Sequence, residues 1–213
     1  MNTHSYGNYF MWPPGAYKIA GRETLPRPTL GEELYFWEAG EHILDHVEGH
    51  RDTVVTPART GPVLDVLYSA AGNSADEHWY NRHIFGWDFE VGDIGFQPPW
   101  DSAHAEAMEF ASGIIGLLEV ARAYAHDETA PTSTLTTTRQ GNTVSATFDS
   151  TEPATIYYTT DGSEPTTSSA VYEQLRMREL VGKPIEARAG DTLRWFAVDA
   201  KGNREALRSA TLG

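Results

Sequence analysis

Hydrophobic residues recur at helical spacing directly after residue 29. Residues 29–32 read Thr-Leu-Gly-Glu, a capping box in which the Thr hydroxyl accepts from an amide of the first turn and the Glu side chain reaches back to the Thr amide. The apolar positions that follow fall on one helical face: Leu34, Trp37, Leu44 and Val47. The pattern predicts a helix that starts near Thr29 and ends near Gly49.

Two further helices are predicted before residue 125. Residues 74–82 suit a short helix with Ser74 as its N-cap. The clearest helical pattern in the chain runs from His104 to Tyr124. Its apolar stripe, at spacings of three and four, consists of Ala107, Phe110, Ile114, Leu117, Leu118, Ala121 and Tyr124.

Extended segments and a loop lie between these helices. Prolines and glycines over residues 11–28 predict a loop. Residues 84–90 alternate between apolar and polar positions, which predicts a strand. Residues 62–68 fit either a short strand or a buried turn of helix, and periodicity does not separate the two at this length. Helices and strands in this order predict an α/β domain.

The character of the chain changes after Asp127. Residues 130–134, Ala-Pro-Thr-Ser-Thr, indicate a linker, and the residues beyond are rich in Thr and Ser without a helical period. Candidate strands, separated by turns at 161–162 and 201–203, lie at 143–148, 154–160, 185–188 and 192–198. Short strands with regular turns over about 80 residues predict a small immunoglobulin-like β-sandwich.

Charge and histidine content support the same division. The chain has 213 residues and a formal net charge of −14. Residues 1–130 carry 20 acidic and 7 basic side chains, a net charge of −13, whereas residues 131–213 carry 10 and 9, a net charge of −1. All eight histidines lie in the first part. We therefore predict two domains, residues 1–128 and residues 129–213.

Composition also excludes several classes of function. Nucleic acid is an unsuitable partner, because phosphate binding needs a clustered basic face that this acidic chain lacks. No run of about 18 apolar residues occurs, so no membrane span is predicted. The absence of cysteine excludes disulfides and thiolate metal sites. The first residues have neither the charged nor the apolar region of a signal peptide.

Three segments of the first part carry residues suited to peptide hydrolysis. His4 stands in Asn-Thr-His-Ser-Tyr, Tyr68 in Leu-Tyr-Ser-Ala-Ala-Gly, and Glu90 in Phe-Gly-Trp-Asp-Phe-Glu. In order, spacing and neighbours they resemble the zinc carboxypeptidase (funnelin metallocarboxypeptidase) family over roughly residues 1–125. The resemblance implies the C-terminal part of an α/β/α carboxypeptidase domain, in a lineage that removes C-terminal residues from peptides and proteins.

The resemblance also implies a role for each residue. His4 corresponds to the third zinc ligand, and Glu90 to the general base that deprotonates the metal-bound water and then protonates the leaving amine. Tyr68 corresponds to a mobile tyrosine that closes over the substrate. Tyr6 and Ala75 are implied at the substrate site. The parent enzyme is expected to be secreted and to act on peptide or protein C-termini.

Two departures from the family pattern bear on activity. The family's first two zinc ligands come from a His-x-x-Glu motif upstream of the third, and no histidine of this sequence is followed by glutamate three positions later. The upstream arginines that grip the substrate carboxylate are also missing. Because catalytic zinc takes three protein ligands, we expect zinc in the intact parent enzyme but neither tight zinc nor activity in this chain alone. The alternative is a non-catalytic remnant that acts as a binding or structural protein through its β-sandwich.

A second metal hypothesis rests on histidine spacing. His42, His46 and His50 recur at i, i+4 and i+8 and fit one helical face. Two histidines at this spacing supply a bidentate site at best, and the predicted helix ends before His50. A polar face exposed to solvent is the simpler interpretation.

The second part carries a more specific motif. Residues 154–165, Ala-Thr-Ile-Tyr-Tyr-Thr-Thr-Asp-Gly-Ser-Glu-Pro, resemble the small β-sandwich domain at the C-termini of chitobiases and β-hexosaminidases. The aromatic pairs Tyr157-Tyr158 and Trp195-Phe196 suggest carbohydrate stacking, but neighbours on a strand point to opposite faces, so at least one of each pair belongs to the core. We expect an accessory structural domain, with carbohydrate as the alternative partner.

Overall fold

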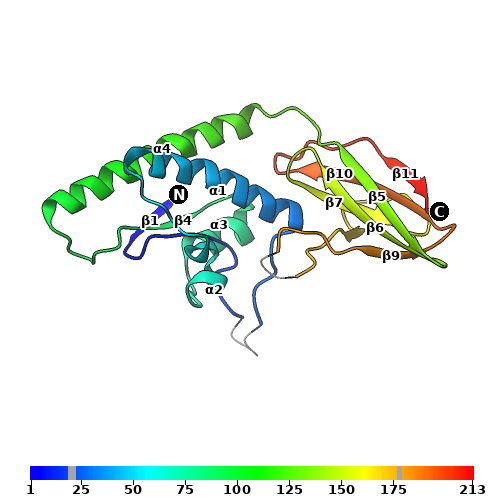
Figure 1. Ribbon diagram of the computed structural model, residues 1–213, viewed down its shortest axis with the longest axis horizontal. Coiled ribbons are helices and arrows are strands. Elements are labelled where there is room, and N and C mark those ends of the chain that lie inside the picture. The colour runs from blue at the N-terminus through cyan, green and yellow to red at the C-terminus, as the bar shows by residue number, and fades with distance from the viewer. Residues whose placement is uncertain (19–22, 177–178) are drawn as a thin grey trace. The chain divides into compact units, whose positions relative to one another are not determined.

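The computed structural model describes residues 1–18, 23–176 and 179–213 (Figure 1). The described residues form two compact units, Met1–Pro28 with Phe36–Ala123 and Thr29–Tyr35 with Tyr124–Gly213. The first unit is of mixed helix and sheet, and the second is rich in strands, which confirms the predicted structural classes at this level. Residues 19–22 of the predicted loop lie outside the described residues. No described helix has the length and apolar character needed to cross a membrane.

The sheet of the first unit is organised around strand β4 (Asp88–Val91). β1 (Asn2–Ser5) pairs with β4 in parallel, and β2 (Tyr9–Trp12) pairs with its other edge antiparallel. β3 (Thr60–Pro62) joins β2 in parallel, which gives the strand order β1-β4-β2-β3. The predicted strand that ends at Glu90 begins later than expected, because its pairing with β1 starts only at Asp88.

Short helical turns flank β3. η1 (Pro57–Arg59) precedes it, and α2 (Val63–Val66) follows directly after Pro62. The segment 62–68 therefore holds a turn of helix, one of its two predicted structures. Proline is favoured at the start of a helix because its backbone nitrogen carries no hydrogen, so Pro62 leaves no unpaired amide there.

Helix α1 (Leu30–Arg51) begins with the predicted capping box. The Thr29 hydroxyl accepts from the Glu32 amide at 3.2 Å, and the Thr29 amide donates to the Glu32 carboxylate at 2.7 Å. The helix runs slightly beyond its predicted end, and its buried face is rotated from the predicted one. Phe36 and Ile43 are fully buried, because they face the packed interior of the first unit.

Helix α3 (Ser74–Arg82) is capped by Asn73, so the predicted N-cap, Ser74, is wrong by one residue. Asn73 Oδ1 accepts from the Asp76 amide at 2.8 Å. The Ser74 hydroxyl donates instead to Asp88 Oδ1 on β4, at 2.6 Å. Both side chains favour an N-cap, and the tertiary contact to Asp88 decides which of them takes it.

Helix α4 (Trp100–His126) contains the predicted helix but buries a different face. Its buried positions are Glu106, Glu109, Gly113 and Gly116. Leu118, placed in the predicted apolar stripe, is 63% exposed. The predicted stripe is offset from the buried face: its members Phe110 and Ile114 are half-buried, whereas the buried positions of the helix include two glycines. The buried Glu109 carboxylate is paired, with Arg51 Nε 3.0 Å from Glu109 Oε1.

Aromatic rings fill one face of the first sheet. Phe10 on β2 and Phe89 on β4 meet edge to face, with ring centroids 5.4 Å apart. Phe36 of α1 stacks on Trp12 at 5.9 Å, and Phe110 of α4 lies 6.2 Å from Phe89. α1 and α4 therefore supply the apolar cover of this face, which leaves the opposite side chains of β1 and β4 to carry polar groups.

The second unit packs two sheets of described strands face to face. The first has the order β11-β10-β7-β8 and the second β5-β6-β9. The strands are β5 (Ser133–Gln140), β6 (Thr143–Ser150), β7 (Ala154–Thr159), β8 (Ala170–Val171), β9 (Ile185–Arg188), β10 (Thr192–Asp199) and β11 (Arg208–Thr211). Val144 and Phe148 of β6 share a core cluster with Leu193 and Trp195 of β10, which is the packing of a β-sandwich.

The predicted strands of this unit correspond to β6, β7, β9 and β10. β5 was not predicted, because its run of serine and threonine offers no apolar alternation. Ser133 is fully buried, while most of the strand's other residues are exposed. The strand is held by its antiparallel pairing with β6, which extends from Ser133 to Gln140. Pairing rather than burial therefore fixes β5.

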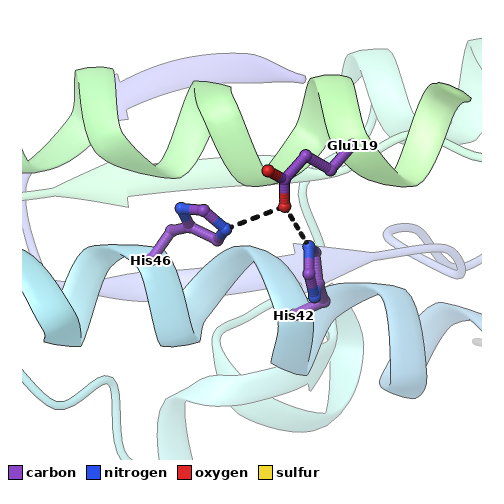
Figure 2. Close-up of side chains that lie close together, drawn as sticks. All are labelled: His42, His46 and Glu119. Carbon is purple, nitrogen blue, oxygen red and sulfur yellow. Dashed lines mark hydrogen bonds and ion pairs between the residues drawn. The ribbon is translucent and has the colours of Figure 1, made fainter.

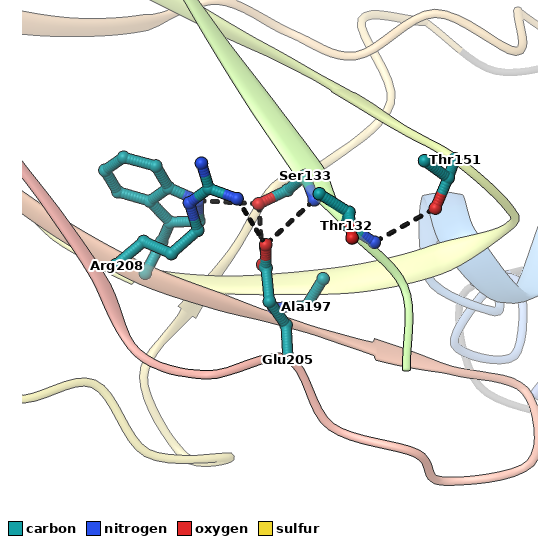
Figure 3. Close-up of polar contacts among 7 residues, drawn as sticks. Thr132, Ser133, Thr151, Ala197, Glu205 and Arg208 are labelled. Carbon is teal, nitrogen blue, oxygen red and sulfur yellow. Dashed lines mark hydrogen bonds and ion pairs between the residues drawn. The ribbon is translucent and has the colours of Figure 1, made fainter. Parts of the chain in front are cut away.

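A buried carboxylate ties the start of β5 to β10 (Figure 3). Glu205 is 7% exposed and accepts from the amide and hydroxyl of Ser133 at 2.9 and 2.6 Å. It also accepts from the Ala197 amide at 3.3 Å and from Arg208 Nη1 at 2.9 Å. The indole of Trp195 donates to the Ser133 hydroxyl at 2.8 Å. These bonds compensate the cost of burying the charge.

Removing this carboxylate is expected to destabilise the second unit. Glu205→Ala leaves the Ser133 amide and the Arg208 guanidinium without their partner, which lowers the free energy of unfolding by about 2–4 kcal/mol. The measurement is urea denaturation followed on the Trp195 indole N–H resonance. The matched control, Glu128→Ala, removes an exposed carboxylate and changes this free energy by no more than about 0.5 kcal/mol. Equal effects of the two substitutions would contradict the role of Glu205.

Candidate functional site

Parallel pairing of β1 with β4 places His4 directly opposite Glu90. The two residues are 86 positions apart in the sequence and become register partners near the C-terminal ends of the two strands. Partners in register project to the same side of a sheet, so the imidazole and the carboxylate share one face. His4 is exposed and Glu90 is half-buried. Of the residues implied by the carboxypeptidase resemblance, the structure brings these two together.

A chain of hydrogen bonds lies beside this pair. The Asn2 side-chain amide is 3.1 Å from His4 Nε2 and donates to the Ser74 hydroxyl at 2.8 Å. Ser74 in turn donates to Asp88 Oδ1 at 2.6 Å. Asn2 and Asp88 are also register partners on β1 and β4, two residues before His4 and Glu90 and therefore on the same face. The chain therefore connects the strands to the N-terminus of α3 and orients the His4 ring.

The environment of Glu90 favours its protonated form. Burial raises the pKa of the Glu90 carboxyl above its ordinary value, the neighbouring His4 lowers it, and the Asp88 carboxylate raises it. A carboxyl whose pKa is raised is suited to exchange protons, since both protonation states become accessible closer to neutral pH. This property is consistent with the general-base role that the resemblance implies.

Tyr6 lies just beyond the end of β1, where the backbone continues to pair. The Gly7 amide donates to the Gly92 carbonyl at 2.8 Å, and the Arg59 guanidinium donates to the Gly7 carbonyl. The Tyr6 ring is 41% exposed and meets Phe96 edge to face at 4.8 Å. This aromatic pair is exposed at the end of the sheet and is available for contact with a ligand. The substrate role of Tyr6 stays a prediction.

Tyr68 and Ala75 are placed differently from each other. Tyr68 lies between α2 and α3 and is 66% exposed, and within the described residues no hydrogen bond or ring contact joins it to His4 or Glu90. Ala75, near the start of α3, is 1% exposed and belongs to the interior. An exposed tyrosine is free to move, as the predicted role requires, whereas Ala75 has almost no surface from which to line a pocket. Both roles stay predictions.

The residues around His4 do not by themselves fit catalytic zinc, which needs three protein ligands. Within the described residues, the groups whose ligand atoms lie within 4.8 Å of one another are elsewhere: His42, His46 and Glu119, and Asp127, Glu152 and Asp199. His4 is in neither group. Among the described residues, the His4–Glu90 pair therefore lacks the ligand set that a zinc-dependent step requires.

The second unit has a cleft of about 750 Å³ beside β7 and β8. Its lining includes Tyr158 of β7, Asp161 in the following turn, and Glu173 and Lys183 from the chain between β8 and β9. A neighbouring hollow of about 500 Å³ shares Thr160, Asp161 and Glu186 with it, so the two adjoin and are treated together as the groove. The acidic and basic residues of the groove were not identified from the sequence, because they are far apart along the chain.

The four aromatic residues suggested for carbohydrate stacking have different surroundings. Trp195 and Phe196 are 3% and 0% exposed, so stacking by either of them is excluded. Tyr157 stacks on Phe196, with ring centroids 5.3 Å apart, and Arg204 lies over that same Phe196 ring at 3.7 Å. Tyr158 is the member of the four that lines the groove. Burial, followed by the Glu173 charge, raises its phenol pKa, so the hydroxyl stays protonated and able to donate at neutral pH.

Charge substitutions next to Glu90 are expected to move its pKa in opposite directions. His4→Ala removes a positive neighbour and raises the Glu90 pKa, whereas Asp88→Asn removes a negative neighbour and lowers it. The measurement is ¹³C NMR titration of the Glu90 carboxyl between acidic and neutral pH. Glu119→Gln, on α4, serves as a control that leaves this titration unchanged. A Glu90 pKa at its ordinary value in all four proteins would contradict the geometry of the pair.

Comparison with known proteins bears on the second unit. A comparison with curated proteins finds no match to the chain. Nothing in the comparisons supports the carboxypeptidase resemblance of the first part, which stays a prediction. Residues 128–209 match the family described as the chitobiase/beta-hexosaminidase C-terminal domain, which confirms the resemblance drawn from residues 154–165 and identifies the β-sandwich as similar to that domain.

Proposed function

We propose that this chain is a non-catalytic binding protein that acts through its β-sandwich. The observation that carries the proposal is the family match over residues 128–209, which spans the strands from β5 to β10 and the start of β11. The sandwich holds a closed apolar core and a satisfied buried carboxylate, Glu205, so its framework needs no ligand to be stable. A rigid framework beneath a surface groove is the arrangement in which loops and strand ends bind ligands.

The groove favours a neutral ligand rich in hydroxyl groups. Its acidic side chains, Asp161, Glu173, Glu186 and Asp191, outnumber the basic Lys183 and Arg188, so their net charge repels anions. Hydrogen-bonding groups outnumber apolar ones, and Tyr158 and Tyr172 add two aromatic rings. A groove with aromatic rings and many polar groups matches an oligosaccharide, in which apolar ring faces alternate with hydroxyl groups.

Replacement of Tyr158 tests this proposal. Tyr158→Ala is expected to weaken oligosaccharide binding by about 1 kcal/mol, roughly fivefold in Kd, since an aromatic contact contributes about that much. The measurement is isothermal titration calorimetry of the 213-residue chain with a hexosamine oligosaccharide and a neutral glucan oligosaccharide. Tyr157→Ala is the matched control, because the adjacent tyrosine packs on Phe196 and is expected to leave Kd unchanged. Binding of neither sugar, or equal losses in both variants, would refute the carbohydrate assignment.

The juxtaposition of His4 and Glu90 favours a second candidate function. We propose on this ground that the first unit belongs to the zinc carboxypeptidase lineage, in a parent enzyme that is secreted, holds zinc and acts on peptide C-termini. The register that pairs an imidazole with a carboxyl of raised pKa supports the proposal. His4 supplies one of the three ligands that zinc requires, so we propose that the chain alone is inactive.

Peptidase assays of this chain are expected to show no release of C-terminal residues, with or without added zinc. Without positioned substrate and metal-bound water, Glu90 has no activated nucleophile to deprotonate, and these two effects supply most of the rate in metal-assisted hydrolysis. The readout is amino-acid release from a peptide with an apolar C-terminal residue and from one with a basic C-terminal residue. Activity that disappears in both His4→Ala and Glu90→Gln would contradict this expectation.

A further inference from the structure

Two histidines of α1 and a glutamate of α4 converge on one point of the first unit (Figure 2). His42 Nε2 and His46 Nε2 lie 2.9 and 3.1 Å from the same oxygen, Glu119 Oε2. The three ligand atoms all lie within 4.8 Å of one another. The histidine spacing was visible in the sequence, but the third group comes from a residue 77 positions after His42.

Close packing of the two helices fixes this convergence. A Cβ atom on Gly116 would come within 2.9 Å of the His46 ring, and one on Gly113 within 2.9 Å of the Val47 side chain. The Ser112 hydroxyl donates to the His46 carbonyl at 2.8 Å, which pins α4 against the same turn of α1. Glu119 stands one turn beyond Gly116 on α4. The packing of the two helices therefore brings Glu119 beside His42 and His46.

The spacing of the three atoms suits a small divalent cation. Zinc bonds to imidazole nitrogen at about 2.0–2.1 Å and to carboxylate oxygen at about 2.0–2.2 Å, so neighbouring ligands of a tetrahedral site lie about 3.3–3.4 Å apart. The observed 2.9 and 3.1 Å separations need to open only slightly to admit the ion. The side chains are partly exposed, so this adjustment meets little resistance.

The protonation state of Glu119 and the negative charge of the surrounding chain also favour the binding of a cation. Hydrogen bonds from His42 and His46 lower the Glu119 pKa, so its carboxylate is ionised at neutral pH. An incoming metal replaces the proton shared between an imidazole and this carboxylate, and the displaced proton leaves to solvent. The net charge of −13 over residues 1–130 raises the local concentration of cations around the site.

We infer that His42, His46 and Glu119 form a binding site for a divalent transition metal such as zinc, which ties α1 to α4. The ligand set of two imidazoles and one carboxylate is one that zinc, cobalt and nickel accept. This site is separate from His4 and Glu90, and it depends neither on the peptidase lineage nor on the sandwich groove. Bound metal would fasten the two helices that cover the aromatic face of the first sheet.

Metal titration of the full 213-residue chain tests the site. Calorimetry with Zn²⁺ is expected to show one equivalent bound, and Co²⁺ is expected to give the visible absorption of a four-coordinate nitrogen and oxygen site. His42→Ala, His46→Ala and Glu119→Gln are each expected to weaken Zn²⁺ binding at least about tenfold, the loss that follows removal of even an outer partner of a metal ligand. Glu119→Gln keeps an oxygen that accepts hydrogen bonds, so it separates loss of ligation from loss of helix packing.

Two matched substitutions serve as controls. His50→Ala removes an exposed histidine of α1 outside the cluster, and His4→Ala removes the imidazole beside Glu90. Both are expected to leave the zinc stoichiometry, the Kd and the Co²⁺ spectrum unchanged. The inference is overturned if no saturable binding occurs at millimolar metal, if the three cluster variants bind as tightly as the native chain, or if His4→Ala abolishes binding.

Discussion

The candidate site of the first unit depends on the parallel pairing of β1 with β4. Backbone hydrogen bonds of 2.8 Å from Asn2 to the Trp87 carbonyl and from Gly7 to the Gly92 carbonyl bracket this pairing. Because β4 also pairs with β2, it connects both halves of the sheet. A slip of one residue would turn every side chain of β1 to the other face, which would separate His4 from Glu90.

The two units differ in whether their candidate sites have all the residues that the predicted function needs. In the first, the sheet register supplies a histidine and a carboxyl of raised pKa, but no second or third zinc ligand joins them among the described residues. In the second, a closed core and the bonded Glu205 carboxylate support a groove lined by Tyr158. The sandwich therefore carries the proposed binding function, while α1 and α4 carry a metal site independent of both.

Local signals predicted much of this structure, and tertiary contacts account for the rest. The capping box at Thr29 and the alternating strands β6 and β10 follow from neighbouring residues, and they were predicted. The cap at Asn73 was missed because Ser74 is drawn to Asp88, a contact that local sequence does not reveal. The predicted α4 stripe is offset from the buried face because close helix packing favours glycine over larger apolar residues. Glu119 was missed as a partner of His42 because it lies 77 positions later in the chain, on a different helix.

The most direct test of the account locates ligand binding on the intact chain by ¹⁵N–¹H NMR during titration with a neutral oligosaccharide. The account predicts shift changes in the amides around Tyr158, Asp161, Glu173 and Lys183, with the β1 and β4 amides unmoved. Changes centred on His4 and Glu90, or no changes at saturating sugar, would contradict the claim that the sandwich groove is the binding site.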